Sequence, residues 1–276
     1  MPTVSIRGSE LHYELHGTSG DPTLLLHGSL VDHHCWDALV APLSQNLQVV
    51  AYDRRGYGQS TGPTRAHPVR DDAADLAGLL EEIDLYPAHV IAHSYGGAVG
   101  FRLATDRPEM VRSLAVHETP FVGLLEDDPE NAAEARRLLL GIRMVQDRIH
   151  AGDVPGAVRE IVNSFSTDGG AWSRLRPPTQ EQFLRNAPRW SEEFDDPDAI
   201  RPEGRGLADL LIPVMLTSGE RSPLFLRRVN AALARSLRNV TLLTIPDAGH
   251  VPHLTAPQQY AGLLLSFLLE RNVPTD

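Results

Sequence analysis

Residues 89–97 read His-Val-Ile-Ala-His-Ser-Tyr-Gly-Gly, an apolar stretch that runs into Ser94 and is followed by two glycines. The apolar residues predict a buried strand, and the glycines predict a sharp turn into a helix. Such a strand–turn–helix arrangement exposes a serine as a nucleophile. It needs small residues two positions to either side, here Ala92, where glycine is usual, and Gly96. We therefore take Ser94 as the candidate nucleophile; the alternative is a surface serine at a strand end.

Outward from this turn, apolar runs of strand length alternate with helical patterns. The alternation predicts an α/β fold with a doubly wound, mostly parallel sheet and helices on both faces. Strands are expected at residues 4–7, 11–15, 23–27, 47–52, 88–92, 112–116, 213–217 and 240–245. Helices are expected at residues 36–43, 71–83, 96–105, 225–237 and 257–270.

The alternation breaks between about residues 120 and 205, where Glu, Asp, Arg and Pro are frequent and helices with loops are favoured. The clearest helix there is expected at residues 130–149. An insertion that returns to the same sheet commonly covers a pocket at the carboxyl ends of the strands. We expect a core domain of residues 1–119 and 206–276 and a helical cap of residues 120–205, in which Trp172 and Trp190 are candidate substrate contacts.

Composition excludes several classes of function. The net charge of −11 argues against a nucleic-acid or anionic-membrane surface, and all 25 basic residues are arginines. Without lysine, Schiff-base chemistry, pyridoxal phosphate chemistry and a Walker-type phosphate site are excluded. Cys35 is the single cysteine, so neither an intrachain disulfide nor a cysteine-rich metal site can form. With no signal peptide or membrane span apparent, we expect a cytoplasmic monomer or homodimer acting on a small, apolar molecule.

A second motif, His27-Gly28-Ser29, ends the first long apolar strand. Acyl-transfer chemistry needs two backbone N–H groups aimed at the developing oxyanion. We expect one from Tyr95, the residue after the nucleophile, and one from Ser29. Gly28 lets the backbone approach closely, and Gly28 and Leu30 are also expected to contact the substrate. A plain turn is the alternative interpretation of this motif.

A general base is expected after the last strand, where residues 245–255 read Ile-Pro-Asp-Ala-Gly-His-Val-Pro-His-Leu-Thr. His250 follows that strand and a glycine, on a loop at the same sheet edge as Ser94, where it can remove the serine proton. His253 is the alternative and is expected to pack or to cap the last helix. His93 and His117 lie at strand ends, where they could orient loops, and are assigned no chemistry.

Together, these segments resemble the α/β-hydrolase superfamily. The resemblance rests on HGS at 27–29, DRRGYGQS at 53–60, AHSYGG at 92–97 and DAGHVPHLTAP at 247–257, in that order along nearly the whole chain outside the insertion. It implies a parallel core sheet with a helical cap over the active site. It also implies that residues 53–60 are structural and shape the turn after the second long strand.

The sequence departs from this family at the third member of the triad. The resemblance implies an aspartate shortly after the strand at 213–217, but residues 219–223 read Gly-Glu-Arg-Ser-Pro and place Ser222 at that position. A serine cannot stabilise an imidazolium as a carboxylate does. The acid must therefore come from elsewhere, or the triad is incomplete.

Glu118, in Val-His-Glu-Thr-Pro at 116–120, is the preferred candidate for the acid. Some branches of the superfamily place the acid on this neighbouring strand, and the segment resembles the His-Glu-x-Pro of fungal lactonases that open zearalenone. The order Ser94, Glu118, His250 is also the order typical of the fold. Glu220 and Asp247 remain alternatives.

A serine rather than an aspartate at the turn argues against epoxide hydrolases and haloalkane dehalogenases, whose ester intermediates need a carboxylate nucleophile. The sequence predicts a serine hydrolase that cleaves a small-molecule ester or lactone through an acyl-enzyme, with no metal or cofactor. The alternatives are cofactor-free C–C bond hydrolysis, perhydrolase activity or polyketide tailoring on the same triad. The remaining alternative is a ligand sensor without catalytic activity.

Overall fold

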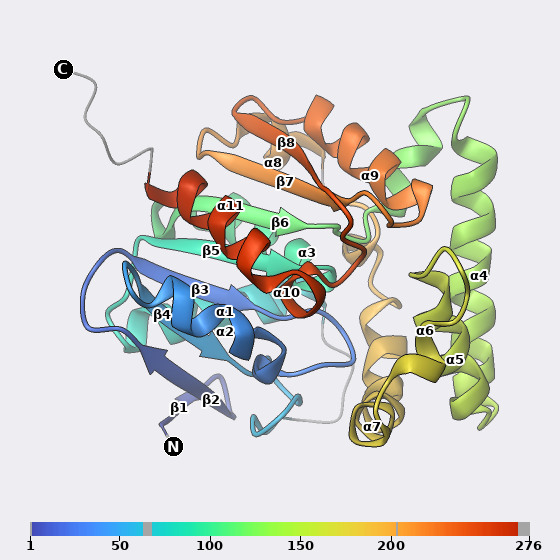
Figure 1. Cartoon of the computed structure of the whole chain (residues 1–276), viewed down its shortest axis with the longest axis horizontal. Coiled ribbons are helices and arrows are strands. Elements are labelled where there is room, and N and C mark those ends of the chain that lie inside the picture. The colour runs from blue at the N-terminus through green and yellow to red at the C-terminus, as the bar shows by residue number, and fades with distance from the viewer. Residues whose placement is uncertain (1, 63–67, 203, 270–276) are drawn as a thin grey trace.

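The computed structural model describes residues 2–62, 68–202 and 204–269, with the side chains of residues 204 and 205 left out. Its centre is an eight-stranded sheet in the order β1-β2-β4-β3-β5-β6-β7-β8 (Figure 1). The β1–β2 and β2–β4 pairs are antiparallel and the remaining pairs are parallel. The strands are β1 Thr3–Ile6, β2 Ser9–His16, β3 Pro22–Leu26, β4 Gln48–Tyr52, β5 Ala88–His93, β6 Val111–His117, β7 Val214–Gly219 and β8 Val240–Ile245. The predicted fold class is confirmed.

Helices cover both faces of the sheet because its central strands are apolar on both sides. Leu24 and Leu26 of β3 belong to one hydrophobic cluster, and Leu25 between them belongs to another on the opposite face. The first cluster includes residues of α2 (Val69–Glu82), α3 (Tyr95–Asp106) and α9 (Leu224–Arg235). The second includes α1 (Asp37–Leu43) and α11 (Pro257–Leu269), which lie in front of the sheet in Figure 1. The predicted end of the last helix at Glu270 lies outside the described residues.

The segment between β6 and β7 is mainly helical. It contains α4 (Ala132–His150), α5 (Val154–Ser164), α6 (Ala171–Arg174) and α7 (Pro177–Glu193), which stand together beside one edge of the core in Figure 1. Their apolar side chains form a third cluster that is separate from the two clusters of the sheet. The expected cap boundary at residue 205 falls within α8 (Gly204–Asp209), where Gly206 approaches Thr105 of α3. The division into two domains stays a prediction.

No helix in the described ranges is long and apolar enough to cross a bilayer. The expected location of the protein in the cell stays a prediction.

Candidate active site

Ser94 lies on the turn between β5 and α3, in a strained backbone conformation with φ 52° and ψ −124°. A non-glycine residue keeps a positive φ only where its surroundings hold it there. The turn is tight because α3 begins against β3: a Cβ added to Gly96 would lie 2.5 Å from the Leu26 carbonyl oxygen and 2.7 Å from that of His27. The small residue expected at position 96 is therefore required by backbone contacts.

The end of β3 approaches the same turn. A Cβ added to Gly28 would lie 3.1 Å from the Ser94 Cβ and 3.0 Å from His93 Nδ1, so only glycine fits here without a shift. Among the described residues, no hydrogen-bond partner is found for the backbone N–H of Ser29 or for that of Tyr95, the first residue of α3. The two N–H groups expected to bind an oxyanion are therefore both available.

His250 and Glu118 meet although they lie on different loops. His250 Nδ1 is 2.8 Å from Glu118 Oε2, and both side chains are buried. The other carboxylate oxygen, Oε1, accepts a hydrogen bond of 2.9 Å from the backbone N–H of Gly219. Like Ser94, Glu118 has a positive φ, 50°, directly after its strand. The carboxylate is thus held from both sides and points one oxygen at the imidazole.

The surroundings keep Glu118 ionised. Burial alone would raise the pKa of the Glu118 carboxyl, but the interactions with His117 and the hydrogen bond from His250 outweigh burial and hold it well below its usual range. His117 Nε2 lies 3.4 Å from the same oxygen that contacts His250. Glu118 can therefore stabilise a positive charge on His250 at neutral pH.

The alternative acids do not contact His250. Glu220 is exposed and accepts a hydrogen bond from the backbone N–H of Asp247, and Asp247 pairs with Arg221 at the surface. Ser222, which occupies the position expected for an aspartate, is buried, and its hydroxyl has no partner among the described residues. Of the three carboxylates considered from the sequence, the structure brings only Glu118 to the histidine.

Two histidines hold the loop that carries the candidate base. His93 donates a hydrogen bond of 2.8 Å to the carbonyl oxygen of His250, and His117 donates one of 3.2 Å to that of Gly249. The loop is thereby fixed to the ends of β5 and β6. His253 is fully buried beside His93 and Trp36, with ring centroids 4.6 Å and 4.8 Å away. It packs there, and burial holds its pKa well below the usual range.

No hydrogen bond joins the Ser94 hydroxyl to His250 in the part of the chain that the structure describes. Hydrogen bonds of this kind are often long without substrate and tighten when it binds. The Phe165 ring stacks on the imidazole of His250, with centroids 4.2 Å apart and planes 9° apart. Nothing in the sequence indicated this contact, because Phe165 follows α5 in the inserted segment.

A cavity of about 190 Å³ opens onto the nucleophile. Ser94 and Glu118 line it together with mostly apolar side chains of α4, α5 and α9, and with Phe165 and Phe194. None of the four expected substrate contacts lines this cavity. Gly28 lies behind Ser94, whereas Leu30, Trp172 and Trp190 pack in or against the hydrophobic cluster of the inserted helices.

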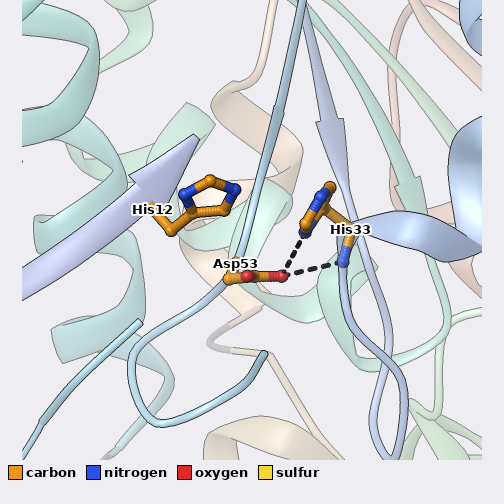
Figure 2. Close-up of side chains that lie close together, drawn as sticks. All are labelled: His12, His33 and Asp53. Carbon is orange, nitrogen blue, oxygen red and sulfur yellow. Dashed lines mark hydrogen bonds and ion pairs between the residues drawn. The ribbon is translucent and has the colours of Figure 1, made fainter. Parts of the chain in front are cut away.

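Two groups of histidines and carboxylates in the described residues come close enough to hold a metal ion. One is His117, Glu118 and His250. The other is His12, His33 and Asp53, where Figure 2 shows the Asp53 carboxylate between the two imidazoles.

Hydrogen bonds already satisfy this second carboxylate. Asp53 Oδ1 accepts from the backbone N–H of His33 and lies 2.7 Å from its Nδ1, and Oδ2 accepts from the N–H of Gln59 (Figure 2 shows the first two contacts). Burial alone would lower the pKa of His33, but the hydrogen bond and charge of Asp53 outweigh it and raise that pKa. The cluster therefore holds the turn of residues 53–60, the structural role implied for this motif.

Known proteins are similar to this chain over most of its length. A 2-(acetamidomethylene)succinate hydrolase from Mesorhizobium japonicum is 26% identical over 262 residues, covering 91% of this chain and 88% of that protein. A haloalkane dehalogenase from Bradyrhizobium diazoefficiens is 28% identical over 265 residues, 83% of each. A malate-bound structure of a thermophilic esterase from Thermogutta terrifontis has a TM-score of 0.77 at 25% identity, covering 98% of this chain and 97% of that one.

The family model described as alpha/beta hydrolase fold matches residues 21–257, which include every strand from β3 to β8 and all the candidate catalytic residues. The chain belongs to the alpha/beta hydrolase fold family.

Proposed function

We propose that this protein is a serine hydrolase that cleaves a carboxylic ester or lactone of a small, apolar molecule through an acyl-enzyme on Ser94. The observation that carries the proposal is the buried His250–Glu118 pair, whose carboxylate lines the same apolar cavity as the strained Ser94. The Ser94 hydroxyl supports acyl chemistry over dehalogenation, because a dehalogenase of this fold needs a carboxylate nucleophile.

In the proposed reaction, His250 Nε2 removes the Ser94 proton as Oγ attacks the ester carbonyl. Glu118 holds the proton on Nδ1 and stabilises the imidazolium that forms. The N–H groups of Ser29 and Tyr95 bind the oxyanion of the tetrahedral intermediate. His250 then gives its proton to the leaving alkoxide, and a water molecule, activated by the same imidazole, releases the acid.

Labelling with a fluorophosphonate tests the nucleophile. We expect the folded protein to be labelled on Ser94 and the Ser94→Ala variant to remain unlabelled. Ser164→Ala is a matched control, because this serine lines the same cavity but donates its hydroxyl to the Ile161 carbonyl. Labelling should be accompanied by a burst of product from short p-nitrophenyl esters. Wild-type protein that is folded but neither labelled nor active on esters or lactones would refute the proposal.

A further inference from the structure

One face of α7 contacts the loop of residues 28–32, which we call the oxyanion loop. Gln182 donates a hydrogen bond of 2.7 Å to the Asp32 carboxylate, and Asn186 donates one of 2.9 Å to the Leu30 carbonyl oxygen. At the end of the helix, Glu193 accepts a hydrogen bond from the Ser29 hydroxyl. Residues 182, 186 and 193 lie on the same face because a helix turns once every 3.6 residues.

Glu193 also belongs to a buried charge cluster behind the oxyanion loop. Its Oε1 accepts hydrogen bonds from Arg54 and from the Tyr57 hydroxyl, the latter at 2.9 Å. Arg54 is 1% exposed, and it donates to the carbonyl oxygens of His27 and Gly28 at 3.2 Å and 3.1 Å. Glu193 therefore reaches the loop twice, directly through Ser29 and indirectly through Arg54.

The guanidinium of Arg54 also contacts Tyr95, the residue expected to provide the second oxyanion donor. It lies over the ring of Tyr95, 4.6 Å from the centroid, and pairs with Asp72 at 3.0 Å. Cation–π contacts of this kind favour a fixed ring position. One cluster anchored by a helix of the inserted segment thus contacts Ser29 and Tyr95, the two residues whose N–H groups are proposed to bind the oxyanion.

The backbone of the loop needs such support. Leu30 has φ 69°, in the left-handed region that a non-glycine residue keeps only when its surroundings impose it. Its carbonyl is bound by Asn186, and its side chain is buried in the hydrophobic cluster of the inserted helices. The backbone conformation directly after Ser29 is therefore held by α7 and its neighbours.

We propose that α7, through Glu193 and Asn186, positions the oxyanion hole, so that the hole forms only while this helix is docked on the core. Glu193 is a positioning residue: it touches Ser29 and Arg54 and not the reacting atoms. The inference rests on the proposed function, because it assigns a role to residues around the same nucleophile. The inserted segment then has two roles that belong to different helices. Side chains of α4 and α5 line the cavity, whereas α7 positions the oxyanion loop.

The test compares Glu193→Gln and Asn186→Ala with Glu192→Gln. Glu192 is adjacent in the helix, but among the described residues its side chain, which is 30% exposed, pairs with Arg189 alone, at 3.4 Å. Misplacing one oxyanion donor should cost less than deleting it, so we expect kcat to fall about 10- to 100-fold in the first two variants with KM changed less than threefold. Glu192→Gln should match the wild type.

A second readout separates positioning from mere stability. Phenylboronic acid adds reversibly to a catalytic serine and places a negatively charged oxygen in the oxyanion hole. Its inhibition constant should rise by a factor similar to the loss of kcat, whereas inhibition by a neutral alcohol that fills the cavity should not change. Asn186→Ala removes one hydrogen bond between neutral groups and leaves no buried charge without its partner. This variant can therefore be tested even if Glu193→Gln, which removes the charge that pairs with Arg54, does not fold.

Failure of this inference can be distinguished from failure of the proposed function. Wild-type protein that is neither labelled nor active would refute the serine hydrolase itself. If the wild type is active, and the folded variants keep kcat and the boronic acid affinity within twofold, α7 does not position the oxyanion hole. A loss of melting temperature with an unchanged boronic acid affinity would likewise overturn the inference.

Discussion

Replacing Glu118 by glutamine is expected to leave the fold intact and to stop catalysis by trapping the wrong tautomer of His250. The two oxygens of Glu118 have different partners: Oε1 accepts from the Gly219 N–H, and Oε2 faces His250 Nδ1. In Glu118→Gln the amide oxygen must stay opposite the Gly219 N–H, because an NH₂ group there would face another donor. The NH₂ group then faces Nδ1, which must accept a hydrogen bond and be unprotonated. The proton moves to Nε2, where it prevents removal of the Ser94 proton.

The expected loss in kcat is about 10³- to 10⁴-fold, the size found when a triad carboxylate becomes an amide. This corresponds to about 4–5 kcal/mol of transition-state stabilisation. Steady-state turnover of a p-nitrophenyl ester, with enzyme concentration fixed by absorbance and folding checked by circular dichroism, measures it. Glu220→Gln is the matched control, since Glu220 contacts the Asp247 backbone and not His250. An active Glu118→Gln together with an inactive Glu220→Gln would refute the assignment.

Three further predictions concern other parts of the site. Burial raises the pKa of Asp72 from 3.8 to about 6, so ionisation destabilises the fold as the pH rises through that window. The unfolding free energy of the wild type minus that of Asp72→Asn, from urea titrations, should be lower at pH 7.5 than at pH 4 by about 2 kcal/mol; a difference independent of pH would contradict this. Gly96→Ala should destabilise by about 1–3 kcal/mol in thermal unfolding, because its Cβ meets two carbonyl oxygens. Gly262→Ala is the control, because Gly262 is exposed in α11 and a Cβ added there has no atom within 4 Å; this variant should be neutral or stabilised by up to about 1 kcal/mol. Equal changes in stability for the two variants would count against the reasoning. Phe165→Ala should lower kcat/KM about 2- to 10-fold by removing the ring stacked on His250, and an unchanged kcat/KM would exclude a role for the stack.

Much of the fold could be predicted because its signals are local. The strand expected at residues 88–92 is observed as β5, Ala88–His93, and the one expected at 240–245 is β8 with the same bounds. Of the inserted helices, only α4 was placed from the sequence, although α5 and α7 are also amphipathic. Trp172 and Trp190 were expected to contact the substrate, but neither lines the cavity, and Trp190 is 6% exposed and packs in the hydrophobic cluster of the inserted helices.

Some residues of the candidate site could likewise be predicted from local motifs, and others could not. Local motifs pointed to Ser94 and His250, and the serine at position 222 pointed away from the usual acid. The sequence could rank Glu118 over Glu220 and Asp247 only by resemblance, since nothing local tells which carboxylate faces the histidine.

The sequence by itself determined that a serine stands on a tight turn between a buried strand and a helix, because that pattern is written in nine consecutive residues, 89–97. Only the tertiary structure decided what surrounds the serine. Glu118 and His250 are 132 residues apart in the chain, and Ser29 and Glu193 are 164 apart. The first contact depends on the order of the strands in the sheet, because Glu118 follows β6 and His250 follows β8, and the second depends on how α7 docks on the core. No periodicity or motif within one segment encodes which partner is met.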